Sequence, residues 1–327
     1  MLVVVDNSNS MEQEQALLTT AFPELIRALV TGDINADGTA EFIGAMNVHI
    51  GVVTTDMGTA GYAIPTCSEP TFGDDGVLRT AGDPGDGSCS ATYPKVLDYR
   101  AGGALSALRA DFTCVATVGI GGCGFEQQLE AALEAVTPAG SVTRFFMDTT
   151  GHADGANSGF LRTDSIVVIL VVTDEEDCSV EDPDFFNPAS MVYFGSLNNR
   201  CVTGSGGLYG IPRYAEGFRA LRPGAPHRVI FAGLVGIPLD LEGATYDIML
   251  DDPDMQYIFD VGSVLRPSCN DVGRGVAYAP RRIVRAAQEL SRLGSGTLVR
   301  SICRDDCADF FTAMLGQIQP VLESSCP

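Results

Sequence analysis

Oxygen-bearing side chains occupy every position of one short segment near the amino terminus, Asp6-Asn7-Ser8-Asn9-Ser10. When such side chains alternate in a tight turn, they can all point at one centre. Oxygen-only ligands of this kind hold hard cations such as Mg²⁺ or Ca²⁺. The spacing therefore predicts a divalent metal site with Asp6, Ser8 and Ser10 as candidate ligands. The alternative is that these residues only cap a helix, since Ser and Asp are good N-caps.

A second acidic turn, Asp174-Glu175-Glu176-Asp177, follows the most apolar segment of the chain, 165–173 with the sequence SIVVILVVT. This segment is rich in β-branched residues and apolar on both faces, as expected for a central parallel strand. An apolar strand is also predicted over 2–6, so both turns follow strands. Ligands of open α/β sheets bind beyond the carboxyl ends of the strands. We therefore expect Asp174 to belong to the same metal site as Asp6.

The D-x-S-x-S turn after an apolar strand, together with Thr173-Asp174 after the central strand, resembles the metal-ion-dependent adhesion site of von Willebrand factor type A domains. The phrases HIGVVTTDMG, GFEQQLEAA and TDEEDCS are also similar to an exported bacterial branch of this family. The resemblance covers most of the chain apart from its insertions. It implies that Ser8 and Ser10 bind the metal directly, while Asp6 and Asp174 hold coordinating waters.

The family also places a metal-binding threonine in the loop before a middle helix, and here the chain departs from the pattern. The corresponding loop, 119–126, has the sequence GIGGCGFE. Its nearest oxygen ligands are Glu126 and, further back, Thr117. We expect Glu126 to take the place of the threonine, because the first turn of a helix faces the strand ends.

A second candidate cation site lies in the segment 33–41. Four acceptors occupy positions 1, 3, 5 and 9 of a calcium loop, and glycine occupies position 6: Asp33, Asn35, Asp37, Glu41 and Gly38. Position 12 is Gly44, where an EF-hand has a bidentate glutamate. Two interpretations remain open, a structural Ca²⁺ site and a solvated turn.

Alternating apolar and amphipathic segments predict an α/β fold. We expect a Rossmann-like doubly wound, mostly parallel central sheet with helices on both faces. The predicted strands are 2–6, 48–54, 165–173, 228–235 and 297–302. The predicted helices are 11–30, 125–136, 281–293 and 306–322.

Three long segments rich in Gly, Asp, Pro and Cys, at 57–113, 177–225 and 236–280, exceed ordinary connections in length. We expect them to be disulfide-tied loop insertions of one elaborated type A-like domain that spans 1–327. No internal repeat or clean linker divides the chain.

Ten cysteines, an even number, do not fall into the C-x2-C pairs of zinc sites. Because lasting disulfides need an oxidising compartment, we expect an exported protein, whether periplasmic, cell-surface or extracellular, whose signal peptide is not in this chain. The alternative is a cytosolic chain with buried thiols. We leave the partners of Cys269 and Cys303 open. For the other cysteines we expect pairs between near neighbours: Cys67–Cys89, Cys114–Cys123, Cys178–Cys201 and Cys307–Cys326.

The 42 acidic and 20 basic residues give a net charge of −22, which argues against nucleic-acid partners. No apolar run reaches the ~20 residues of a membrane span. We therefore expect a non-enzymatic adhesion or protein-binding module without catalytic residues. Its Mg²⁺ or Ca²⁺, with Mn²⁺ also possible, would complete its shell with a carboxylate from a protein or peptide partner. The alternatives are a metal-dependent hydrolase and a structural surface protein stabilised by calcium and disulfides.

Overall fold

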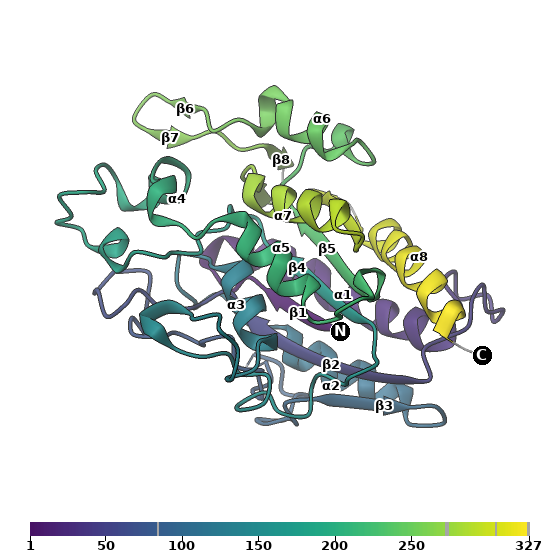
Figure 1. Cartoon of the computed structure of the whole chain (residues 1–327). Coiled ribbons are helices and arrows are strands. Elements are labelled where there is room, and N and C mark those ends of the chain that lie inside the picture. The colour runs from purple at the N-terminus through teal and green to yellow at the C-terminus, as the bar shows by residue number, and fades with distance from the viewer. Residues whose placement is uncertain (84, 272–274, 305, 326–327) are drawn as a thin grey trace.

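The computed structural model describes residues 1–327 except 84, 272–274, 305 and 326–327 (Figure 1). Its centre is a six-stranded sheet with the strand order β3-β2-β1-β4-β5-β10. The strands are β1 (Leu2–Val5), β2 (Asn47–Thr54), β3 (Leu97–Arg100), β4 (Val167–Val172), β5 (Val229–Val235) and β10 (Gly296–Ser301). All neighbours are parallel except β3, which pairs antiparallel with β2 at one edge. The predicted α/β fold with a mostly parallel sheet is confirmed.

Helices lie against both faces of this sheet. Because side chains of a strand alternate between faces, Val3 and Val5 of β1 belong to one hydrophobic cluster and Leu2 and Val4 to another. The first cluster contains residues of α1 (Glu12–Thr31), α2 (Leu105–Ala116) and α8 (Ala308–Ser325). The second contains residues of α3 (Gln128–Val136), α5 (Ile211–Arg219), α6 (Tyr246–Asp251) and α7 (Arg281–Arg292).

Smaller elements complete the described part of the chain. They include α4 (Arg200–Thr203) and the hairpin strands β6 (Phe259–Asp260), β7 (Val264–Leu265), β8 (Cys269–Asp271) and β9 (Gly275–Ala277). The 3-10 turns are η1 (Asn9–Met11), η2 (Phe146–Asp148), η3 (Pro183–Phe186), η4 (Leu197–Asn199), η5 (Ser205–Gly207), η6 (Pro226–Arg228), η7 (Leu239–Leu241) and η8 (Pro253–Met255). No described helix has both the length and the apolar character needed to cross a membrane.

The predicted insertions contain ordered elements as well as loops. The segment 57–113 supplies the edge strand β3 and most of α2, which packs against α1. The segment 177–225 supplies α5, which packs against α7 on the second face. The high Gly, Asp and Pro content around these elements conceals their short apolar patterns, so the sequence analysis did not separate them from loops.

Among the described residues, four disulfides join eight cysteines. Cys178–Cys201 is confirmed. The predicted pairs Cys67–Cys89 and Cys114–Cys123 are wrong, because the bonds are Cys67–Cys123 and Cys89–Cys114. A fourth disulfide, whose partners the sequence left open, joins Cys269 to Cys303. The predicted Cys307–Cys326 bond falls outside the described residues, and Cys307 is buried.

The near-neighbour rule fails for a packing reason. Cys123 and Cys67 share one small cluster with Phe125, which packs the insertion against the loop before α3. Cys114 belongs to α2, and its partner comes from the segment that runs beside that helix. The four disulfides indicate an oxidising environment, as expected for an exported protein.

Peptide mapping without reduction should recover the four observed linkages. Each closes a loop of more than twenty residues and should stabilise the folded chain by about 2–4 kcal/mol, because it restricts the unfolded chain. Thermal unfolding before and after reduction measures the total. A fragment that links Cys67 to Cys89 would contradict this arrangement.

Candidate metal centre

The residues that follow β1 and β4 lie together because these strands are adjacent and parallel. Val5 pairs with Val172 at their carboxyl ends. The Asp6 N–H donates to the carbonyl of Val172 at 3.0 Å, and the Thr173 hydroxyl donates to Asp6 Oδ2 at 2.5 Å. The structure therefore brings the two predicted acidic turns to the same edge of the sheet.

The two serines of the first turn face each other. Ser8 N–H donates to Asp6 Oδ1 at 2.8 Å, which folds the turn back on itself. The hydroxyl oxygens of Ser8 and Ser10 then lie 3.0 Å apart. Ser8 precedes the 3-10 turn η1, yet its side chain makes no capping hydrogen bond there. The helix-cap alternative therefore does not account for the position of these hydroxyls.

Asp174 is fully buried, and neither of its carboxylate oxygens has a hydrogen-bond partner. Asn7 Oδ1, Thr55 Oγ1 and Glu14 Oε2 are likewise buried without a partner. Buried polar groups are normally hydrogen-bonded, and an unpaired buried carboxylate is especially costly. Four of these five atoms are carboxylate or amide oxygens. Such oxygens can only accept a hydrogen bond or bind a cation. A cation beside Asp174 would supply the partner that its two carboxylate oxygens lack.

Repulsion between carboxyl groups adds to the effect of burial. Burial raises the pKa of Asp6, although hydrogen bonds from neighbouring groups oppose the shift. Burial, and then the charges of Asp6 and Glu175, raise the pKa of Asp174 and of Glu126 well above the usual range. Burial and Asp6 raise the pKa of Glu175 to about 8. A divalent cation would relieve this repulsion.

Glu126 lies at the site, although it does not belong to a helix. It precedes α3, which begins at Gln128 rather than at the predicted 125, and it forms a β-bridge with Asp56. Its side chain is 6% exposed and lines the same cavity as Ser10. Thr117 instead donates its hydroxyl to the carbonyl of Thr113 at the end of α2. Of the two candidates for the threonine position, Glu126 is the one beside the acidic turns.

The last two acidic residues of the second turn form hydrogen bonds that hold neighbouring segments in place. Asp177 accepts hydrogen bonds from Leu129 N–H at 2.9 Å and from Arg282 Nε at 2.9 Å. Glu176 accepts from the backbone N–H of Arg282 and from the Tyr257 hydroxyl. Asp174 and Glu175 are therefore the acids of this turn without such a scaffold partner, while Glu176 also lines the cavity at the site.

A cavity of about 500 Å³ opens above the two turns. Ser10, Glu126 and Glu175 form part of its floor and walls. Asn9, Gly124 and Glu176 also line it. The three predicted insertions supply the remaining residues, which are Thr66, Ser196, Asn198, Asn199, Cys201, Val202, Gly262, Ser263, Val264, Leu265 and Tyr278. The candidate centre is therefore open to a ligand, and the insertions shape the opening.

The spacing of the two serine hydroxyls, which also form a hydrogen bond, is compatible with Mg²⁺ as a ligand-bound ion. Mg²⁺ binds oxygen at about 2.0–2.1 Å in octahedral geometry, so adjacent ligand oxygens are about 2.9 Å apart. The Ser8 and Ser10 oxygens, at 3.0 Å, match this spacing. Ser8 and Ser10 would hold the cation directly, and Asp6 and Asp174 would orient its waters. When bound, the cation would supply an electrophilic centre facing the cavity.

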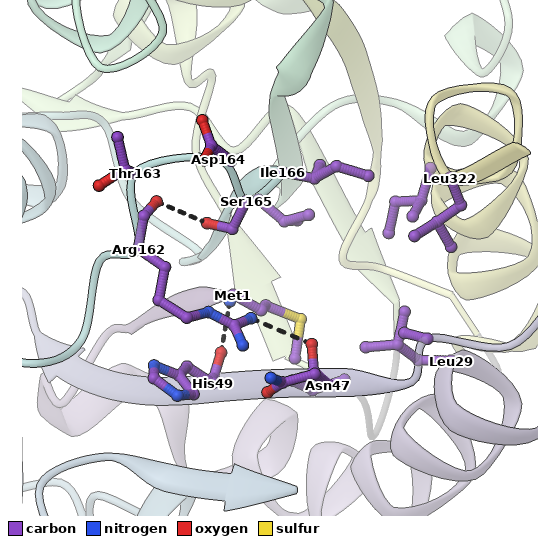
Figure 2. Close-up of a pocket in the computed structure, with 14 residues that line it drawn as sticks. Met1, Leu29, Asn47, His49, Arg162, Thr163, Asp164, Ser165, Ile166 and Leu322 are labelled. Atoms are coloured by element: carbon purple, nitrogen blue, oxygen red, sulfur yellow. Dashed lines mark hydrogen bonds between the residues drawn. The ribbon is translucent and has the colours of Figure 1, made fainter. Parts of the chain in front are cut away.

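Figure 2 shows a second cavity of similar size at the opposite end of the sheet. Here the Met1 amino group donates to the carbonyl of His49 at 2.6 Å, and Arg162 donates to the carbonyl of Asn47 at 3.0 Å. These polar groups already have partners within the protein. The cavity also lies at the start of β1 and β4, away from the acidic turns, so it is separate from the candidate metal centre.

The predicted calcium loop brings its three carboxylates together. One oxygen each of Asp33, Asp37 and Glu41 lies within 4.8 Å of the others. The side-chain oxygen of Asn35 accepts from Asp37 N–H at 2.9 Å, and Glu41 accepts from Ile34 N–H. These bonds hold the loop as a turn without a cation, so Ca²⁺ binding here stays a prediction.

Sequence reasoning missed four residues beside the main site: Asn7, Glu14, Thr55 and Glu175. Glu175 stands where the family has glycine, and Asn7 lies inside the quoted motif, so both carried a signal. Thr55 follows β2, and Glu14 lies in the first turn of α1. Their approach to Asp6 and Asp174 depends on the packing of the sheet edge, which spacing alone does not reveal.

No protein-family model, curated protein or solved structure matches this chain. A functional assignment must therefore stand on the fold and the site geometry.

Proposed function

We propose that this chain is a von Willebrand factor type A-like module that binds a protein or peptide partner through a divalent cation and catalyses nothing. The cation, Mg²⁺ or Ca²⁺ with Mn²⁺ as a further candidate, would sit on Ser8 and Ser10 and accept a carboxylate from the partner. The module would act outside the cytoplasm, in the periplasm, at the cell surface or in the medium. The observation that carries the proposal is the buried, unpartnered Asp174 carboxylate beside the paired serine hydroxyls.

The topology supports this assignment. Starting from β1, the order runs outward through β2 and β3 on one side and through β4, β5 and β10 on the other. From this order and the helices on both faces we infer a doubly wound sheet, and ligands of such sheets bind where the order reverses. The reversal falls between β1 and β4, where Asp6 and Asp174 lie.

The ligand chemistry favours binding over catalysis. Two neutral serine hydroxyls leave a divalent cation with most of its charge, so it attracts an external anion. Metal hydrolases use more carboxylates or histidines as direct ligands. Glu126 and Glu175 on the cavity wall would attract basic residues on either side of the partner's carboxylate.

A metal-dependent hydrolase is the alternative, and the same two glutamates are the observation that favours it. They bring extra carboxylates near the metal, and one of them could serve as a general base at a raised pKa. The scaffold roles of Glu176 and Asp177 argue against a two-metal site. A structural protein without a working metal site is the third interpretation.

A pair of peptides tests the proposal: N-acetyl-Arg-Asp-Arg-amide and its Asn counterpart. With Mg²⁺ present, immobilised Asp peptide should retain the protein and the Asn peptide should not. Retention should disappear with EDTA and in Ser10→Ala. Glu126→Thr should increase retention, because it restores the family's neutral ligand and leaves the cation with more charge.

Two results would contradict this proposal. Equal retention by both peptides, with or without EDTA, would rule out a contact between the partner's carboxylate and the metal. Turnover of phosphoester or peptide substrates that Asp174→Ala abolishes would establish the hydrolase alternative instead.

A further inference from the structure

Three side chains far apart in the sequence meet beside the end of α3. His152 Nε2 lies 3.0 Å from Asp75 Oδ2 and 3.7 Å from Glu134 Oε1. One atom of each of the three lies within 4.8 Å of the others. Asp75 comes from the segment 57–113, Glu134 from α3 and His152 from the loop between α3 and β4. None of them belongs to the centre at Asp6 and Asp174.

The Glu134 side chain is inaccessible to solvent and points into this group. Its Oε1 accepts a hydrogen bond from the Thr149 hydroxyl at 3.2 Å and faces His152, while its Oε2 is buried without any hydrogen-bond partner. A buried carboxylate oxygen without a donor is costly. Asp75 and His152 are 26% and 18% exposed, so solvent reaches the group from their side only.

The spacing and the ligand types fit a zinc ion. Zn²⁺ binds imidazole nitrogen and carboxylate oxygen at about 2.0–2.2 Å, so two ligands of a tetrahedral site are about 3.3–3.5 Å apart. The observed nitrogen–oxygen distances of 3.0 and 3.7 Å lie on either side of this value. Imidazole also selects zinc over Mg²⁺, which prefers oxygen ligands. One histidine and two carboxylates would leave a fourth position for water.

The surrounding backbone holds these ligands in place. The His152 N–H donates to the carbonyl of Glu134 at 3.0 Å. Asn157 joins the same three segments, since its side chain donates to the carbonyls of Gly76 and Ala135 and accepts from Leu78 N–H. The ligands therefore keep their positions without help from a metal, and single substitutions among them should leave the fold intact.

We propose that Asp75, Glu134 and His152 bind Zn²⁺, with a water as the fourth ligand, and that the ion clamps the segment around Asp75 to α3. The competing explanation is a metal-free group in which His152 pairs with Asp75 and Glu134. That pairing leaves Glu134 Oε2 without a partner, whereas a zinc ion on the Glu134 carboxylate neutralises both of its oxygens.

Calorimetric titration with Zn²⁺ in saturating Mg²⁺ tests the site. The wild type should bind one Zn²⁺ at this position, and Co²⁺ in its place should give the visible absorption of a tetrahedral site. His152→Ala should weaken Zn²⁺ binding by at least about 100-fold, since even indirect metal partners cost 10- to 100-fold. Asp75→Asn, at a partly exposed position, should also weaken it and covers the case in which His152→Ala does not fold.

His49 provides the matched control. It is 17% exposed and lies 3.2 Å from a single carboxylate, Asp98. His49→Ala should retain full Zn²⁺ affinity and the Co²⁺ spectrum. Asp174→Asn should retain both as well, since the candidate metal centre at Asp6 and Asp174 is separate. Unchanged Zn²⁺ affinity in folded His152→Ala and Asp75→Asn would overturn the proposal and leave the metal-free group. Equal loss in His49→Ala would overturn it as well.

Discussion

Replacing Asp174 with asparagine should weaken Mg²⁺ binding by about 100-fold, the upper end for loss of a group that orients a metal's surroundings. The same substitution should stabilise the metal-free protein. Both Asp174 oxygens are buried without a hydrogen-bond partner, and burial raises the pKa of this carboxyl, so the amide removes a group that is costly to ionise and breaks no protein hydrogen bond. Each kcal/mol gained should raise Tm by about 2 °C in a chain of this size. Calorimetry and thermal unfolding in EDTA measure the two effects.

Weaker Mg²⁺ binding together with higher metal-free stability would distinguish a residue of the metal site from a structural residue, whose loss lowers stability. In wild type, Mg²⁺ at a hundred times Kd should add about 2.7 kcal/mol of stability, and Asp174→Asn should lose this gain. Asp177→Asn is the matched control, because Asp177 is equally buried but bonds to Leu129 N–H and Arg282. It should lower Tm with and without Mg²⁺. A fall in the metal-free Tm of Asp174→Asn would show that Asp174 is a scaffold residue.

The sheet could be predicted because its strands carry a local signal. The segment VVILVV of β4 is buried at every residue, and a continuous apolar run of mostly β-branched residues is typical of a central parallel strand. The edge strand β3 alternates, as its sequence LDYR and its partial burial show. It carries four residues only, so its assignment to the sheet depends on pairing with β2 and could not be read from its own pattern.

The residues of the candidate sites also differ in whether the local sequence could identify them. Ser8, Ser10 and Asp6 lie within one turn, and Asp174 follows a recognisable strand, so the sequence specifies them locally. Cys67 and Cys123, or Asp75 and His152, approach each other only because the segment 57–113 folds against α3 and the loop before it. Long-range packing decides such pairs, and a single sequence contains no period or spacing that reports it.

The metal-free protein should lose stability as pH rises. Proteins whose carboxylates form salt bridges show the opposite dependence. Glutamates ionise near pH 4 in an unfolded chain. Burial and the charge of Asp6 raise the pKa of Glu175 to about 8, and burial raises that of Glu14 to about 7. Since the folded state then holds more protons than the unfolded state, the free energy of unfolding falls as pH rises from about 4 to about 8.

Each such group contributes a slope of up to about 1.4 kcal/mol per pH unit within this window. Saturating Mg²⁺ should flatten the curve, because the cation favours the ionised carboxyls and replaces their protons. Tm measured in EDTA and in Mg²⁺ across the window should therefore diverge toward pH 8 and converge toward pH 4. Asp174→Asn should reduce the slope in EDTA and remove most of the divergence. A metal-free Tm that rises steadily through the window would show that the carboxyls at the ends of β1 and β4 are paired in solution, and the case for a cation there would fall with it.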